Sequence, residues 1–125
     1  MPESIYETVL DLLQVGLPQG WTKVLFYAEY HIGSYSMQYY VQTGQNAFYD
    51  CFSLSGLSKE TLYMIFLRID GVLAPERKKL PAKNQWSNMT IEYKDTGKFK
   101  VEFGYDDLSN ASVGHFAKWK QDHDV

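Results

Sequence analysis

Few side chains in this sequence have the types and spacing that chemistry requires. No two of the three histidines, His31, His115 and His123, are three or four residues apart, so no helix face would present two of them to a metal ion. The one cysteine, Cys51, lacks the local signatures of catalytic cysteines and is expected to be a small buried apolar residue. The sequence therefore predicts no catalytic residue, no metal site and no cofactor.

Acidic side chains are the remaining candidates for a site. Asp106 and Asp107 follow Tyr105 in a turn-rich segment, where adjacent acids usually accept backbone N–H groups. To act as a general acid and a general base, these two aspartates would need a pocket that raises the pKa of one of them. Glu7 and Asp11 lie four residues apart, on the side of a predicted helix opposite its apolar face. We expect all five side chains to be exposed, and they either bind a partner or simply keep the surface soluble.

The charge of the chain limits the class of partner. The 125 residues carry a net charge of −3, and residues 1–62 hold six acidic and two basic side chains, a net −4. Such a protein is poorly suited to bind nucleic acid directly, because phosphate neutralisation needs clustered Lys and Arg. An acidic surface is better suited to steering a basic protein partner onto itself.

The sequence also indicates a compartment. Its first residues lack the basic and apolar regions of a secretory signal, and no apolar run approaches the roughly 20 residues that cross a membrane. A single cysteine fits a reducing compartment. We therefore expect a cytoplasmic protein that does not bind membranes; the sequence does not indicate an oligomeric state.

Apolar periodicity predicts two long helices. The first carries its apolar face at Ile5, Val9, Leu12 and Leu13. Ser4 and Glu7 form a capping-box pattern at its start, and Gly16 and Pro18 follow its end. The second begins at Ser58 and ends near Gly71 or at Pro75, before a polar connector over residues 76–81. Its predicted core face comprises Leu62, Ile65, Phe66 and Ile69, widened by Met64 and Leu67.

Three strands are predicted between these helices, and two follow the second. The first three cover residues 21–31, 35–42 and 47–52. The last two form a hairpin whose register follows from keeping both apolar sets on one face. A three-residue loop with a left-handed Gly97 places Tyr93 opposite Phe99, Ile91 opposite Val101 and Met89 opposite Phe103, with Glu92 paired to Lys100.

The predicted fold class is α+β. The order along the chain is α-β-β-β-α-β-β, followed by a short C-terminal helix that carries Phe116 and Trp119. Two helices and five mainly antiparallel strands form a two-layer sandwich when both helices pack on one sheet face. We expect residues 1–125 to form a single domain.

Several short segments, spread over most of the chain, form a pattern when their order and spacing are taken together. They are Leu17-Pro18-x-x-Trp21, Val24–Glu29, Trp86–Thr90, Gly97–Val101, Phe103-x-Tyr105-Asp106-Asp107-Leu108 and Trp119-Lys120. In this order and spacing they resemble the YezG-like immunity protein family. The chain departs from the family pattern after Lys120, where Gln121-Asp122-His123 replaces an aromatic residue.

The resemblance implies a bacterial antitoxin. Members of the family bind the nuclease domain of a cognate secreted toxin, for example in contact-dependent growth inhibition, and block it without catalytic residues of their own. Of the matching residues, Tyr105, Asp106 and Asp107 are those expected to reach a toxin. Two other classes of function stay open on the residues alone: a small-molecule-binding α+β domain with tyrosines lining a pocket, and a small enzyme that uses Cys51 or Asp106 with a histidine.

Overall fold

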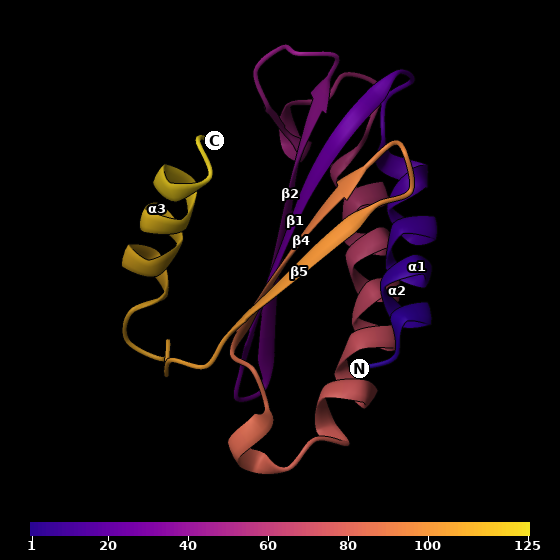
Figure 1. The fold of residues 1–125 in the computed structure, drawn as a ribbon. Coiled ribbons are helices and arrows are strands. Elements are labelled where there is room, and N and C mark those ends of the chain that lie inside the picture. Colours follow the sequence, from indigo (N-terminus) through magenta and orange to yellow (C-terminus); the bar gives the residue numbers. More distant parts are fainter.

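The computed structural model describes residues 1–125 and is built on one antiparallel sheet (Figure 1). Its strands lie in the order β3-β2-β1-β4-β5. Their bounds are β1 Trp21–His31, β2 Ser34–Thr43, β3 Tyr49–Asp50, β4 Asn88–Lys94 and β5 Phe99–Gly104. The predicted third strand is shorter than expected, because the chain turns into a 3₁₀ helix, η2, at Cys51–Ser53.

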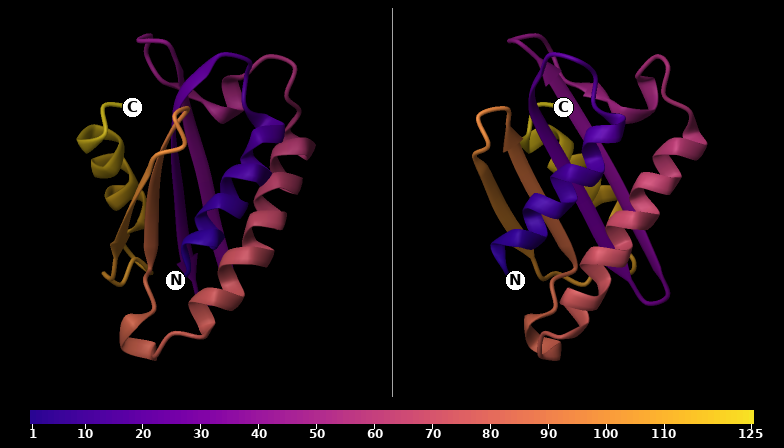
Figure 2. Two further views of the ribbon diagram at one scale, coloured as in Figure 1. Left: turned by 45° about the vertical axis from the view of Figure 1, so that its right-hand side comes forward. Right: turned by 90° about the vertical axis from the view of Figure 1, so that its right-hand side faces the viewer.

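Helices cover both faces of the sheet. Helix α1 (Glu3–Leu13) and helix α2 (Lys59–Lys78) lie side by side on one face, and helix α3 (Ser112–Asp122) lies on the other (Figure 2). The α+β class and the packing of the first two helices on one face are confirmed. Helix α3 adds a partial third layer, in which Trp119 packs against Tyr27 and Tyr40 of the sheet. No helix is both long and apolar enough to cross a membrane.

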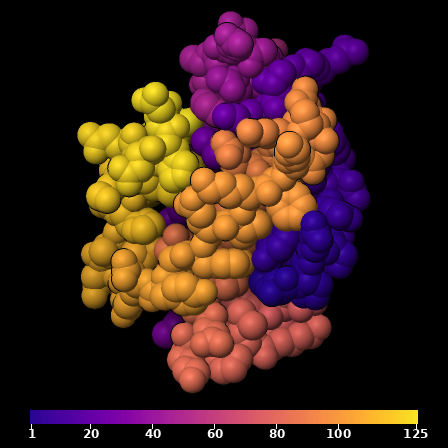
Figure 3. All heavy atoms as spheres, viewed as in Figure 1, coloured from indigo at the N-terminus to yellow at the C-terminus, as the bar shows by residue number.

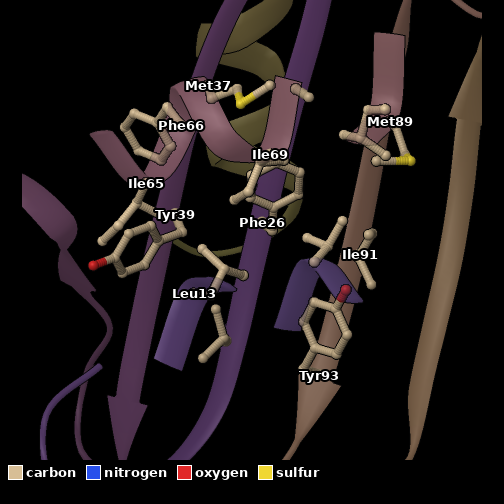
Figure 4. Close-up of a cluster of buried hydrophobic side chains, with 14 of the residues drawn as sticks. Leu13, Phe26, Met37, Tyr39, Ile65, Phe66, Ile69, Met89, Ile91 and Tyr93 are labelled. Atoms are coloured by element: carbon tan, nitrogen blue, oxygen red, sulfur yellow. The ribbon is translucent and has the colours of Figure 1, made fainter. Parts of the chain in front are cut away.

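The main core lies between the sheet and the helices α1 and α2. Alternate residues of β1, β2 and β4 point into it, including Phe26, Tyr39 and Ile91, and meet Leu13 and Ile69 from the helices (Figure 4). Two buried tyrosines place their hydroxyls on backbone acceptors: Tyr39 donates to Gly16 O at 2.6 Å and Tyr93 donates to Tyr6 O at 2.6 Å. These two tyrosines are thus core residues with satisfied polar tips.

The predicted register of the β4–β5 hairpin is confirmed at every position. Tyr93 pairs with Phe99, Ile91 with Val101 and Met89 with Phe103, and Gly97 has φ +91°. Glu92 and Lys100 lie opposite one another, as predicted, but their charged groups do not form an ion pair with each other. Glu92 instead meets Lys23 of β1 at 3.3 Å, and Lys100 meets Glu102 of its own strand at 3.4 Å. Strand β1, which pairs with β4 on its other side, supplies a competing cation that the hairpin alone does not contain.

Helix α1 starts two residues earlier than the capping box predicts. Pro2, with φ −62°, is its N-cap, and no side chain caps the helix. Ser4 therefore lies inside the first turn, where its carbonyl accepts a hydrogen bond from Thr8 Oγ1 at 2.9 Å. The capping box is wrong because Ser4 is already a helical residue, past the N-cap position from which its side chain could cap the helix. Glu7 consequently has no capping role and is exposed.

Helix α2 continues past both of the C-terminal ends predicted for it. Gly71 and Pro75 lie inside it, and it continues to Lys78. A proline in the last turn removes one helix hydrogen bond. Tertiary contacts offset that loss: Leu73 is fully buried, and Arg77 Nε donates to Trp86 O at 2.6 Å. Met64 and Leu67 do not widen the core face as predicted; both are exposed on the outer side of the helix.

Candidate functional site

Tyr105, Asp106 and Asp107 lie on the connection between β5 and α3. All three are exposed, as predicted, and Tyr105 keeps 60% of its surface accessible. Leu108 is buried and anchors the segment to the rest of the molecule. Asp107 Oδ1 accepts a hydrogen bond from Ser109 N at 3.0 Å, and this bond lowers the pKa of the Asp107 carboxyl below its ordinary value. The segment is thus a structured turn that presents two carboxylates to solvent.

These residues form one wall of an open groove of about 690 Å³ at one end of the sheet. The other walls come from the β1–β2 turn, the last turn of α2 and the connection into β4. In Figure 3 the segment after β5 and the residues that follow α2 lie at the same end of the molecule. The lining residues are Tyr30, His31, Ile32, Ser34, Arg77, Gln85, Ser87, Tyr105, Asp106, Asp107, Leu108 and Ser109.

The groove combines apolar and charged side chains. Ile32, at the tip of the β1–β2 turn, is fully exposed, and Tyr105 is largely exposed. Large apolar side chains on a surface, next to charged ones, are typical of protein-binding sites. Arg77 is held between the Tyr30 and Trp86 rings, with its guanidinium carbon 5.4 Å and 5.7 Å from their centroids.

A buried carboxylate fixes the position of His31 in this groove. Glu29 of β1 is 2% exposed, and its Oε2 atom lies 3.1 Å from His31 Nε2 and 2.5 Å from Ser112 Oγ of α3. Tyr27 donates its hydroxyl to Glu29 Oε1 at 2.5 Å, and burial, followed by this hydrogen bond, raises the pKa of Tyr27. Ser112 donates to the carboxylate and not to the histidine, so the arrangement is not that of a histidine-activated nucleophile. It connects β1 to the start of α3.

Glu7 and Asp11 are exposed on α1 and do not line the groove. Helix α1 packs on the sheet face opposite α3, so the structure does not bring these acids together with Asp106 and Asp107 into one site (Figure 1). Neither Glu7 nor Asp11 forms an ion pair. They form a second acidic surface, separate from the groove.

Cys51 has the environment of a core residue. Its side chain is fully buried, and burial raises the pKa of its thiol to about 12. A thiol with this pKa is protonated at neutral pH, whereas a nucleophilic cysteine acts as the thiolate. No cluster of three or more His, Cys, Asp or Glu side chains is placed to hold a metal ion.

The sequence alone did not identify His31, Ile32 and Arg77 as groove residues. His31 ends a predicted strand, Ile32 stands in a turn, and Arg77 falls in the segment 76–81 that the sequence predicts to be a polar connector. An exposed isoleucine at a strand turn is the one signal that could have pointed to a contact surface.

Exposed apolar side chains beside paired acids are features of protein-binding sites. The sequence profile of the family described as Immunity protein YezG-like matches residues 3–123, and the chain belongs to this family. The resemblance noted from the sequence is thus confirmed, and with it the role of an immunity protein that binds a toxin. A comparison with curated protein sequences finds no significant match.

Proposed function

We propose that this immunity protein binds and neutralises the nuclease domain of a cognate secreted toxin in the cytoplasm of the bacterium that makes both, as in contact-dependent growth inhibition. The observation that carries the proposal is the groove at the end of the sheet. It gathers Ile32, Tyr105, Asp106 and Asp107, a combination of apolar anchors and negative charge. Nucleases need positive charge to hold phosphate, so a carboxylate pair can occupy a surface that otherwise binds nucleic acid.

Asp106 and Asp107 are better candidates for this contact than Glu7 and Asp11. The first pair lies beside apolar side chains that a partner would bury, and loss of water strengthens charged hydrogen bonds. The second pair lies on an exposed helix face without such anchors. We therefore expect Glu7 and Asp11 to contribute mainly to the rate of association.

The experiment begins by identifying the toxin, either from the genes that flank the gene of this chain or by pull-down from the native host. Purified toxin domain is assayed for cleavage of plasmid DNA and of RNA, with and without the immunity protein. Loss of cleavage at equimolar immunity protein is the expected result. A toxin domain that binds tightly but cleaves neither polymer would show that the target is not a nuclease.

Titration calorimetry then locates the surface. Asp106→Asn and Asp107→Asn should each weaken binding by about 2–5 kcal/mol if the carboxylate is desolvated in the complex, and Ile32→Ser by about 2 kcal/mol. Asp11→Asn is the matched control, because it removes the same charge from an exposed site outside the groove. Equal losses of affinity in Asp11→Asn and Asp106→Asn would show that the toxin does not bind mainly at the groove.

A further inference from the structure

The guanidinium of Arg77 is fixed in place but has no anionic partner. Its Nε atom donates to Trp86 O at 2.6 Å, and the Tyr30 and Trp86 rings flank it. No carboxylate lies within ion-pair distance, and no protein acceptor takes the Nη protons. The nearby Asp70 accepts the Tyr30 hydroxyl at 2.7 Å and is not ion-paired with Arg77. One hydrogen bond and two rings thus orient the side chain while four N–H groups stay available.

Arg77 stands where two grooves meet. A second groove, of about 330 Å³, shares Tyr30, His31, Ser34 and Arg77 with the first and adds two charged side chains, Asp70 and Lys78. The charge changes sign along this combined groove. One end carries Asp106 and Asp107. The other carries Arg77 and Lys78 against one carboxylate, Asp70, which already accepts the Tyr30 hydroxyl, so its net charge is positive.

The chemistry of Arg77 selects a carboxylate. A guanidinium presents a planar fork of N–H groups that matches the two oxygens of a carboxylate, and aromatic neighbours hold that plane in position. A partner that covers the groove removes water from the guanidinium, which is costly unless an anion replaces the water. A purely basic surface would therefore fit the Asp106–Asp107 end and oppose the Arg77–Lys78 end.

We propose that the toxin segment bound in this groove carries a side-chain carboxylate, Asp or Glu, that pairs with Arg77 and Lys78, next to basic side chains that pair with Asp106 and Asp107. This inference rests on the proposed function and makes it more specific. Because the two ends of the groove have opposite charge, the segment binds in one direction only. Toxins that are basic but lack the carboxylate therefore bind more weakly.

Lys78→Glu tests the inference, with Lys83→Glu as its matched control. Both lysines are exposed, both substitutions change the net charge by the same amount, and Lys83 lines neither groove. Against the purified toxin domain, Lys78→Glu is expected to raise Kd about tenfold or more, and Lys83→Glu less than about threefold. Equal changes in Kd for the two variants would overturn the inference.

A charge swap identifies the carboxylate. Each exposed Asp and Glu of the toxin domain is replaced by Lys, and one of these variants is expected to restore binding to Lys78→Glu while weakening binding to the wild-type chain. If no toxin variant does so, the inference fails.

Arg77→Lys is a second test, since lysine keeps the charge and loses the planar fork. Unfolding in urea is measured alongside, because Arg77 also holds the last turn of α2. The expected result is a rise in Kd of about tenfold with a folded protein. The two proposals fail separately: loss of affinity in Asp106→Asn with none in Lys78→Glu or Arg77→Lys would retain the toxin-binding groove and reject the carboxylate. No binding by the wild-type chain would reject the proposed function itself.

Discussion

Glu29 is the only carboxylate buried in the molecule, and one of its partners, Ser112, belongs to a different element. It accepts hydroxyls from Tyr27 on its own strand and from Ser112 on α3, and it contacts the His31 ring. A buried carboxylate is tolerated when such donors replace water. At the scale of single residues, this one side chain therefore contributes to the stability of the fold and to the position of His31 in the groove.

Glu29→Gln is expected to lower the free energy of unfolding by about 2 kcal/mol, because the amide nitrogen cannot accept one of the two hydroxyls. Urea unfolding measures the loss, and hydrogen exchange should show faster exchange in α3 than in α1. Glu92→Gln is the control: this half-buried acid forms its one ion pair with Lys23, and its loss should cost less than about 1 kcal/mol. Equal costs for the two variants would mean that the hydroxyls add nothing to the stability.

Cys51 allows a test of the buried thiol. Because burial raises its pKa to about 12, the thiolate is scarce at pH 8 and becomes abundant only as the pH approaches that value. The native protein is expected to resist iodoacetamide at pH 8, and the urea-unfolded chain to react fully, as mass spectrometry would show. Cys51→Ser should still protect cells against the toxin. A folded variant that fails to protect would give the thiol a functional role.

At the scale of elements, apolar alternation predicted the strands better than local signals predicted the helix ends. The β4–β5 register follows from alternation, because a shift by one residue would turn every apolar side chain away from the core. Helix ends depend on contacts with distant segments. Pro75 would end an isolated helix, but Leu73 and Arg77 hold its last turns against the sheet and Trp86. Met64 and Leu67 have helical spacing but face solvent, since periodicity does not say how wide the buried stripe is.

The hairpin also allows a comparison of its two strands. Phe103 lies on the edge strand β5 and is only half-buried, packed against the Trp86 ring, whereas Ile91 on β4 is fully buried. Replacing a fully buried phenylalanine with alanine costs about 3–5 kcal/mol of stability, and this range does not apply to the half-buried Phe103. We expect Phe103→Ala to lower the free energy of unfolding by about 2 kcal/mol and Ile91→Ala by about 2–5 kcal/mol. Urea unfolding of both variants is the measurement, and a larger loss at Phe103 than at Ile91 would contradict the burial pattern.

At the scale of the whole molecule, the candidate site is assembled from four segments that are far apart in the sequence. They are the end of β1 with its turn, the last turn of α2, the connection into β4 and the segment after β5. The sequence predicted the acids of one segment, because their motif is local. It could not predict the groove, because periodicity gives the face of an element and not the neighbours at its end. For the same reason, local sequence patterns could not predict which face of the sheet α3 covers.

The distribution of charge over the molecule leads to the last prediction, which concerns the kinetics of toxin binding. The chain has a net charge of −3 and two separate acidic surfaces, Glu7 with Asp11 on α1 and Asp106 with Asp107 at the groove. For a basic partner, exposed charges speed diffusional encounter, and salt screens them beyond about 10 Å at 0.1 M. The association rate is therefore expected to fall about tenfold or more as salt rises from about 0.05 to 0.5 M, while the dissociation rate changes little.

The two surfaces are expected to act on different rates. Asp11→Asn should lower the association rate at low salt and leave dissociation unchanged, because α1 lies outside the contact. Asp107→Asn should mainly speed dissociation, because its carboxylate would be desolvated in the complex. Stopped-flow association and surface-based dissociation, each measured at low and moderate salt, separate these effects. A salt-independent association rate, with dissociation unchanged in Asp106→Asn and Asp107→Asn, would show that the toxin is held by apolar contact. In that case the exposed Tyr63, Met64 and Leu67 of α2 become the surface to test next.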